Sequence, residues 1–92
     1  MEEKAKQNRL IQYRRRMGYT REQVATLLGH CDASMVRRYE RGASVPPMTV
    51  ALMLEIIYRV PVAFLYSALY EALRERIRNE EDSLGPTQQP LF

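Results

Sequence analysis

The chain has 92 residues, 46% of them hydrophobic and 27% charged, so it is long enough for one folded core and too short for two. This balance is typical of a globular protein and argues against a disordered or membrane-embedded chain. The net charge of +3 is unevenly spread, because ten Lys and Arg stand against five acidic residues in residues 1–46, while residues 47–92 are net acidic. One basic side is typical of nucleic-acid binding, and solvated helix faces are the alternative.

The first predicted helix covers residues 4–17. Leu10, Tyr13 and Met17 recur at spacings of three and four with charged residues between them, as on one face of an amphipathic helix. Gly18 should end this helix, because glycine tolerates the left-handed conformation of a helix C-terminus.

Two short helices are predicted next. Thr20 and Gln23 have the spacing of a capping box, in which each side chain satisfies a free backbone N–H, so a helix should begin at Arg21 and end at Gly29. After a turn at residues 30–31, Asp32 is a suitable N-cap for a third helix that extends to residue 41.

The C-terminal half predicts two further helices. The first spans residues 47–58 and is apolar on most sides, as expected for a helix surrounded by others. The second runs from residue 61 to about residue 79 and carries an apolar stripe at helical spacing: Val62, Leu65, Leu69, Leu73 and Ile77. The expected domain covers residues 1–80, and residues 81–92, with two prolines, a glycine and no periodicity, are expected to form a flexible tail.

The second and third helices predict a helix-turn-helix over residues 21–41. In this motif the second helix enters the DNA major groove, and residues at positions i, i+1, i+4 and i+5 face the bases together. Four residues of the third helix have this spacing, and we expect them to contact bases: Ala33, Ser34, Arg37 and Arg38. Three others are expected to contact phosphates: Arg21, Arg41 and Ser44.

Residues 8–66 resemble the Cro/C1-type (XRE) helix-turn-helix family, which is lambda-repressor-like. The resemblance rests on Arg14 before Gly18, on residues 20–25, on Leu28-Gly29, and on Arg38-Tyr39-Glu40-Arg41-Gly42 followed by Pro46. It implies an all-α, five-helix lambda-repressor-like DNA-binding bundle, here with an extended C-terminal helix. It also implies dimers on palindromic operators, and a structural ion pair between Arg14 and Glu40.

The apolar stripe of the last helix has two interpretations. Leu69, Leu73 and Ile77 can pack on the chain's own helices or form a dimer interface, and both can hold along its length. We expect the part beyond Leu69 to form a homodimer, because a two-fold axis places two recognition helices about one DNA turn apart.

These expectations describe a sequence-specific transcriptional regulator that binds duplex DNA, most simply a repressor. A protein-interaction module, such as an antitoxin or an adapter, is the alternative. Its C-terminal helix would bind a protein partner, and DNA binding would be secondary.

No motif in the sequence predicts catalysis, a cofactor or a metal site. His30 and Cys31 have no further ligands at a suitable spacing, and the acidic residues of the last helix alternate with arginines as surface pairs do. We therefore expect a protein that is not an enzyme. The lone cysteine and the lack of a leader or an apolar run long enough for a membrane span favour the cytoplasm.

Overall fold

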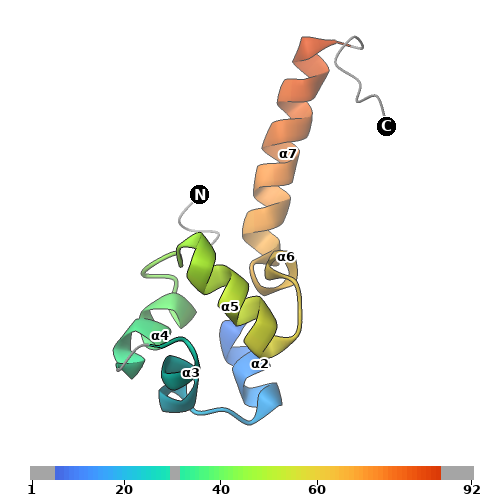
Figure 1. Ribbon diagram of the computed structural model, residues 1–92. Helices are drawn as coiled ribbons and strands as arrows, with labels where there is room; N and C mark the ends of the chain where they lie inside the picture. Colours follow the sequence, from blue (N-terminus) through green and yellow to red (C-terminus); the bar gives the residue numbers. More distant parts are fainter. Residues whose placement is uncertain (1–5, 30–31, 86–92) are drawn as a thin grey trace.

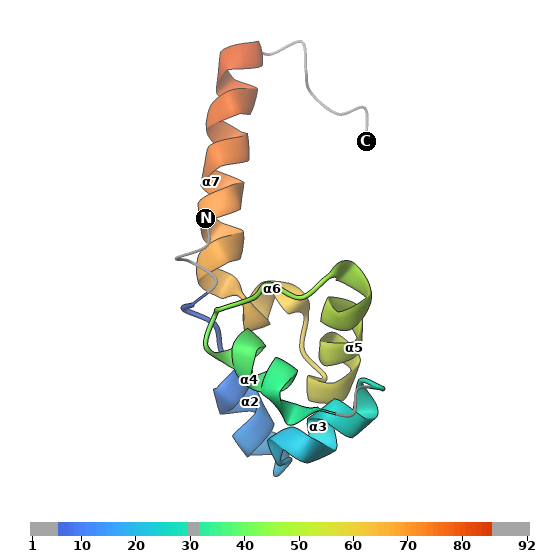
Figure 2. The ribbon, with the colours of Figure 1, turned by 90° about the vertical axis from the view of Figure 1, so that its left-hand side faces the viewer.

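The computed structural model describes residues 6–29 and 32–85, and this part of the chain is helical without strands (Figure 1). The helices are α2 (Leu10–Met17), α3 (Arg21–Leu27), α4 (Ala33–Glu40), α5 (Met48–Tyr58), α6 (Val62–Leu65) and α7 (Ser67–Leu84). The predicted all-α, lambda-repressor-like bundle is confirmed, with six helices instead of five in the described residues. Helices α2 to α6 gather into one body, from which α7 projects as a single long rod (Figures 1 and 2).

The body is built around one apolar core to which every helix from α2 to α6 contributes. Helices α3 and α4 pack on each other, and α2 lies against both α4 and α5. The core consists of Leu10, Val24, Ala25, Leu28, Val36, Tyr39, Val50, Leu54, Tyr58, Leu65 and Tyr66. No residue between Ser67 and Leu84 is buried, and Leu69 is the α7 residue that packs partly against this core.

The first helix begins later than its amphipathic pattern predicted. Residues 6–9 are not helical, and α2 starts at Leu10. The side chain of Asn8 explains this start, because its Oδ1 accepts the backbone N–H of Leu10 at 3.1 Å, as a helix cap does. Its Nδ2 donates to the carbonyl of Tyr39 at 3.1 Å, so the chain is also tied to the end of α4. Residues 4 and 5 lie outside the described part.

The single C-terminal helix predicted over residues 61–79 is wrong in two respects. It is broken at Tyr66, whose φ of −120° and ψ of 48° are not helical, because the Leu65 carbonyl accepts the N–H of Arg9 at 2.8 Å. The break lets Leu65 and its neighbour Tyr66 both enter the core. Helix α7 then continues to Leu84, so residues 81–84 belong to the helix and not to a tail. The predicted flexible segment 86–92 lies outside the described residues.

The N-terminus of α6 is capped by the side chain of Glu55, a residue that was not identified from the sequence. Glu55 on α5 accepts the N–H of Val62 through Oε1 at 3.1 Å, and this satisfies a backbone donor at the N-terminus of the short helix. None of the helices in the described ranges combines the length and hydropathy that crossing a bilayer requires.

Gly42 ends α4 in the left-handed conformation, with φ of +74°, and a Cβ atom there would overlap the backbone of Lys6. Gly18 has a similar φ of +77° but open space around the position of its Cβ. Substitution of Gly18 by alanine would therefore introduce backbone strain alone, whereas substitution of Gly42 would introduce backbone strain and steric overlap.

We predict that Gly18→Ala lowers the free energy of unfolding by about 1–2 kcal/mol, which is the cost of left-handed backbone. Gly42→Ala should cost a further ~1–3 kcal/mol, because the N-terminal segment must move away from the new methyl group. Urea unfolding followed by circular dichroism measures both losses. Equal losses for the two variants would contradict the close approach of Lys6 to Gly42.

Candidate nucleic-acid interface

Helices α3 and α4 begin where the capping patterns predicted. Thr20 Oγ1 accepts the N–H of Gln23 at 3.1 Å, and Gln23 Oε1 accepts the N–H of Thr20 at 2.9 Å, which completes the capping box of α3. Asp32 Oδ1 accepts the N–H of Ser34 at 2.8 Å and caps α4. This hydrogen bond holds the pKa of the Asp32 carboxyl below its ordinary value. These are the two helices of the predicted helix-turn-helix, and residues 30 and 31, which come between them in the sequence, lie outside the described ranges.

Helix α4 has one buried side and one exposed side. Val36, Tyr39 and Glu40 are buried against the body. The predicted base-contacting residues lie elsewhere on the helix: Ser34, Arg37 and Arg38 are exposed and Ala33 is half-buried. The helix is therefore anchored by one side and leaves its first two turns open to a partner.

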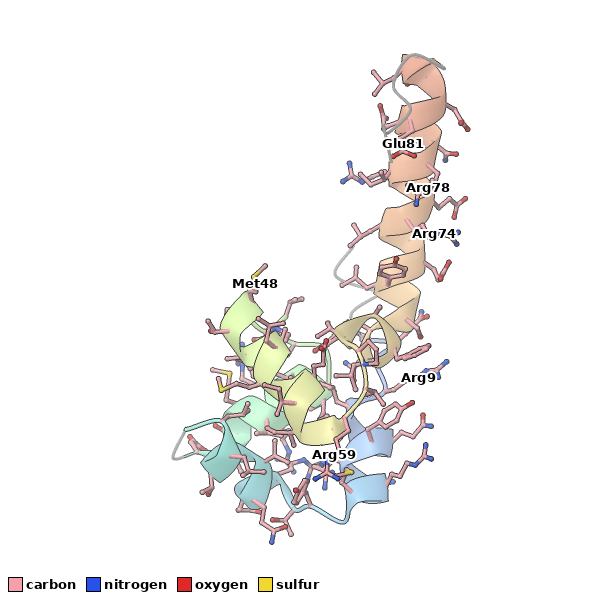
Figure 3. The ribbon with its side chains drawn as sticks, turned by 45° about the vertical axis from the view of Figure 1, so that its right-hand side comes forward. Arg9, Met48, Arg59, Arg74, Arg78 and Glu81 are labelled. Carbon is pink, nitrogen blue, oxygen red and sulfur yellow. The ribbon has the colours of Figure 1, made fainter. Side chains whose placement is uncertain are left out.

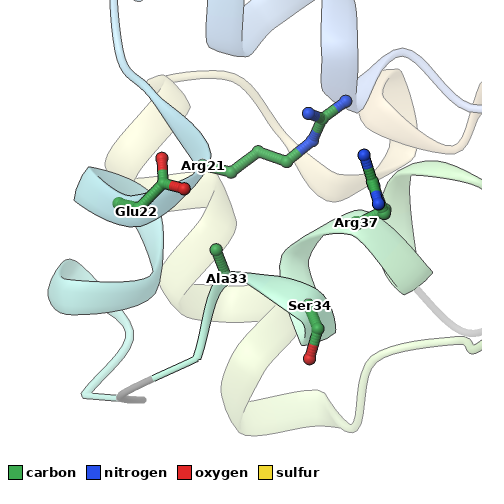
Figure 4. A pocket seen from close by; sticks show the side chains of 5 residues that line it. All are labelled: Arg21, Glu22, Ala33, Ser34 and Arg37. Atoms are coloured by element: carbon green, nitrogen blue, oxygen red, sulfur yellow. The ribbon is translucent and has the colours of Figure 1, made fainter.

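A shallow hollow lies where the first turns of α3 and α4 face each other (Figure 4). It is lined by Ala33, Ser34 and Arg37 from α4, and by Arg21 and Glu22 from α3. The structure thus brings three of the four predicted base-contacting residues together with one predicted phosphate-contacting residue. The sequence pattern did not predict that Glu22 lines this surface. Its position in the first turn of α3, next to Arg21, is the signal that could have identified it.

Arg38 points away from this hollow toward the loop after α4. Its Nε and Nη2 donate to the hydroxyl oxygen of Ser44 at 3.2 and 3.0 Å. One predicted base-contacting residue is therefore paired with one predicted phosphate-contacting residue at the C-terminal end of α4. Arg41 is exposed beside them, at the C-cap of the helix.

Glu40 lies beneath this surface and binds two arginines. Its Oε2 accepts from Arg14 Nε at 2.6 Å and its Oε1 from Arg21 Nε at 2.8 Å, so one carboxylate joins α2, α3 and α4. The Glu40 side chain is 1% exposed and that of Arg14 is 10% exposed. Arg14 also donates Nη1 to the carbonyl of Tyr19 at 3.1 Å, which fixes the segment before α3.

The Glu40 cluster contains the ion pair with Arg14 that the family resemblance implied, and a second pair that was not predicted. Arg21 was assigned to phosphate alone, yet its Nε is bound to Glu40 while its side chain remains 33% exposed. Its terminal amino groups are therefore the part that can meet an external anion. The buried charge also acts on the core, because burial first and then the Glu40 charge raise the pKa of Tyr58.

The residues predicted for the dimer interface divide into two groups. Leu69 packs partly against the chain's own core. Leu73 and Ile77 are 37% and 42% exposed farther along α7.

Across the ranges that the structure describes, no group of His, Cys, Asp and Glu side chains could hold a metal ion. His30 and Cys31, for which the sequence predicts no metal site, fall outside those ranges.

We predict that Glu40→Gln lowers the free energy of unfolding by about 3 kcal/mol, because it leaves Arg14 buried without a counter-charge. Glu71→Gln on α7 is the control, since Glu71 forms an exposed pair with Arg74 at 3.6 Å. Its loss should stay below about 0.5 kcal/mol. Urea unfolding compares the two variants. A Glu40→Gln loss as small as that of Glu71→Gln would show that the cluster does not hold the helices together.

Comparison with known proteins assigns a family to this arrangement. A family model described as helix-turn-helix matches residues 10–65, which run from the start of α2 to the end of α6. Searches of curated proteins and of solved structures gave no match. The matched region includes both helices of the motif, the Glu40 cluster and most of the core, and it stops before α7. The chain therefore belongs to the Cro/C1-type (XRE) helix-turn-helix family of DNA-binding regulators.

Proposed function

We propose that the protein is a sequence-specific transcriptional regulator, most simply a repressor, that reads the major groove of duplex DNA with α4. The observation that carries this proposal is the division of α4 into two sides. Val36, Tyr39 and Glu40 fix the helix to the body, while Ser34 and Arg37 stay exposed on its first two turns. A recognition helix needs this combination, because base reading requires reachable side chains at a fixed orientation.

The proposed base contacts are those of Ala33, Ser34, Arg37 and Arg38. An arginine can donate two hydrogen bonds to guanine O6 and N7, a serine can bond to several bases, and the alanine methyl can touch a thymine methyl. Arg37 is the foremost candidate, because it borders the hollow at the start of α4. Arg38 would have to exchange Ser44 for a base to take part.

The proposed phosphate contacts are those of Arg21, Arg41 and Ser44. Arg21 stands at the first position of α3, where the helix dipole favours an anion, and Glu40 fixes its orientation. Arg41 and Ser44 follow the recognition helix and would meet the backbone at its other end.

The proposal extends to a homodimer on a palindromic operator in the cytoplasm, with the body formed by α2 to α6 as the DNA-binding part. Leu73 and Ile77 support a dimer, because they form an exposed apolar stripe on α7. Leu69 contributes from the edge of the core.

A protein-interaction module, such as an antitoxin or an adapter, remains the second candidate. The length of α7 outside the body and its exposed apolar side chains favour it, because a protein partner could cover them. The candidates differ in whether the α4 face binds DNA.

We predict that Arg41→Ala weakens binding to a labelled duplex and lowers the slope of log affinity against log salt concentration by about 1, since one phosphate contact is lost. Arg78→Ala is the control, because Arg78 is exposed on α7 and pairs with Glu81 at 3.0 Å. That variant should leave the slope unchanged. Fluorescence anisotropy across a salt series measures both.

Equal effects of the two variants would mean that positive charge anywhere on the molecule attracts the duplex. A folded wild-type protein that binds no duplex at low salt would overturn the DNA-binding proposal and favour the protein-interaction module.

A further inference from the structure

Helix α7 exposes large apolar side chains that its own body does not cover. Tyr70, Leu73, Ile77 and Leu84 are 49%, 37%, 42% and 60% exposed. In Figure 3 the labelled Arg74, Arg78 and Glu81 lie on the part of α7 that extends beyond the body. Most helical stability in proteins comes from packing of an apolar face, and most of the 18-residue helix α7 has no such packing within its own chain.

The exposed apolar residues follow the heptad repeat of a coiled coil. Starting at Tyr70, the positions Leu73, Ile77, Glu80 and Leu84 alternate at spacings of three and four. In heptad terms Tyr70, Ile77 and Leu84 occupy position a, and Leu73 and Glu80 occupy position d. Leu69 occupies the flanking position g, so it can border the seam while its side chain packs partly against the core of its own chain.

We propose that α7 pairs with the α7 of a second copy as a short, parallel, two-stranded coiled coil through these residues. The inference deepens the proposed homodimer and rests on it, because it names the contact and its direction. Among parallel coiled coils, an isoleucine at a with a leucine at d favours two strands, and Ile77 and Leu73 have this arrangement.

The charges beside the stripe agree with the parallel direction. Arg76 occupies position g and Glu81 the following position e, so each Arg76 lies beside Glu81 of the second copy, twice in the dimer. An antiparallel pair with Leu73 opposite Ile77 would instead set Arg74 against Arg74 and Arg76 against Arg76. Glu81 accepts from Arg78 of its own helix at 3.0 Å, and a carboxylate has acceptor sites for a second arginine.

The position of α7 in the fold also favours the parallel direction. The helix is about 27 Å long at 1.5 Å per residue, and it points away from the body that carries α4 (Figures 1 and 2). A parallel pair keeps both bodies at one end of the coil, where adjacent half-sites of one duplex can be reached. An antiparallel pair would place the bodies at opposite ends.

Glu80 is the polar residue within the apolar seam, and it provides a sharp test. Two Glu80 carboxylates facing each other oppose pairing, and a polar residue in a seam fixes register at a cost in stability. Glu80→Leu should therefore strengthen the dimer. Glu75→Leu is the matched control, because Glu75 lies at position f, on the opposite side of the same helix.

The test is sedimentation equilibrium of the full chain without DNA, with circular dichroism as the check on folding. We expect a monomer–dimer equilibrium at tens of micromolar. The dimer should tighten at least tenfold in Glu80→Leu, keep its strength in Glu75→Leu, and be lost in Leu73→Asp. For direction, Leu84→Cys in a Cys31→Ser background should form a disulfide-linked dimer under mild oxidation, because parallel strands bring the two residues 84 together.

A Glu80→Leu variant that stays monomeric would overturn the proposal, and so would equal tightening by Glu75→Leu. A dimer in which Leu84→Cys does not cross-link would overturn the parallel direction. These outcomes are separate from the DNA-binding proposal, because the salt titration with Arg41→Ala examines the α4 face whatever the state of α7.

Discussion

The arrangement of the candidate nucleic-acid interface depends on the buried carboxylate of Glu40. It stands at the end of α4 and accepts from Arg14 on α2 and from Arg21 on α3, so the helices that would meet DNA are fixed by one group. A buried charge is costly unless it is paired. The packing of α2, α3 and α4 is therefore favourable when it lets both Arg14 and Arg21 reach the Glu40 carboxylate. The orientation of the recognition helix is thus set by a contact on its inner side.

Hydrogen bonds at the chain reversals complete this frame. Asn8 joins the start of α2 to the carbonyls at the end of α4, Arg9 binds the Leu65 carbonyl, and Glu55 caps α6. Each of these contacts uses a backbone group at a helix end, where helices have unsatisfied donors and acceptors. These contacts connect the ends of short helices to one another. Among the described helices α7 is the one that extends beyond the body (Figure 1), so the face proposed to bind DNA is separate from the helix proposed to pair.

Local chemistry made most of the helices predictable. Thr20 with Gln23 and Asp32 specified the starts of α3 and α4, because a cap involves residues two or three positions apart. The exposed side of α4 followed from helical spacing. The family motif also implied the Arg14–Glu40 pair, which the three-dimensional contacts then extended to Arg21.

The features that were missed depend on contacts between distant parts of the chain. The start of α2 depends on Asn8 reaching residues 39 and 40, and the break at Tyr66 depends on the Arg9 contact with Leu65. Neither leaves a periodic signal, since Val62, Leu65 and Leu69 continue the same stripe across the break. The hydrogen bond from Arg38 to Ser44 likewise depends on the side-chain conformation of Arg38, which helical spacing does not determine.

Selection from a random duplex pool would show whether the α4 face reads base sequence. The bound fraction of the wild-type protein would be sequenced beside that of Arg37→Ala. We expect the wild-type protein to select an inverted repeat with half-sites about one helical turn apart, and the variant to show a weaker preference at one base pair of each half-site. Recovery of no motif, or the same motif at full strength from Arg37→Ala, would contradict base reading by α4.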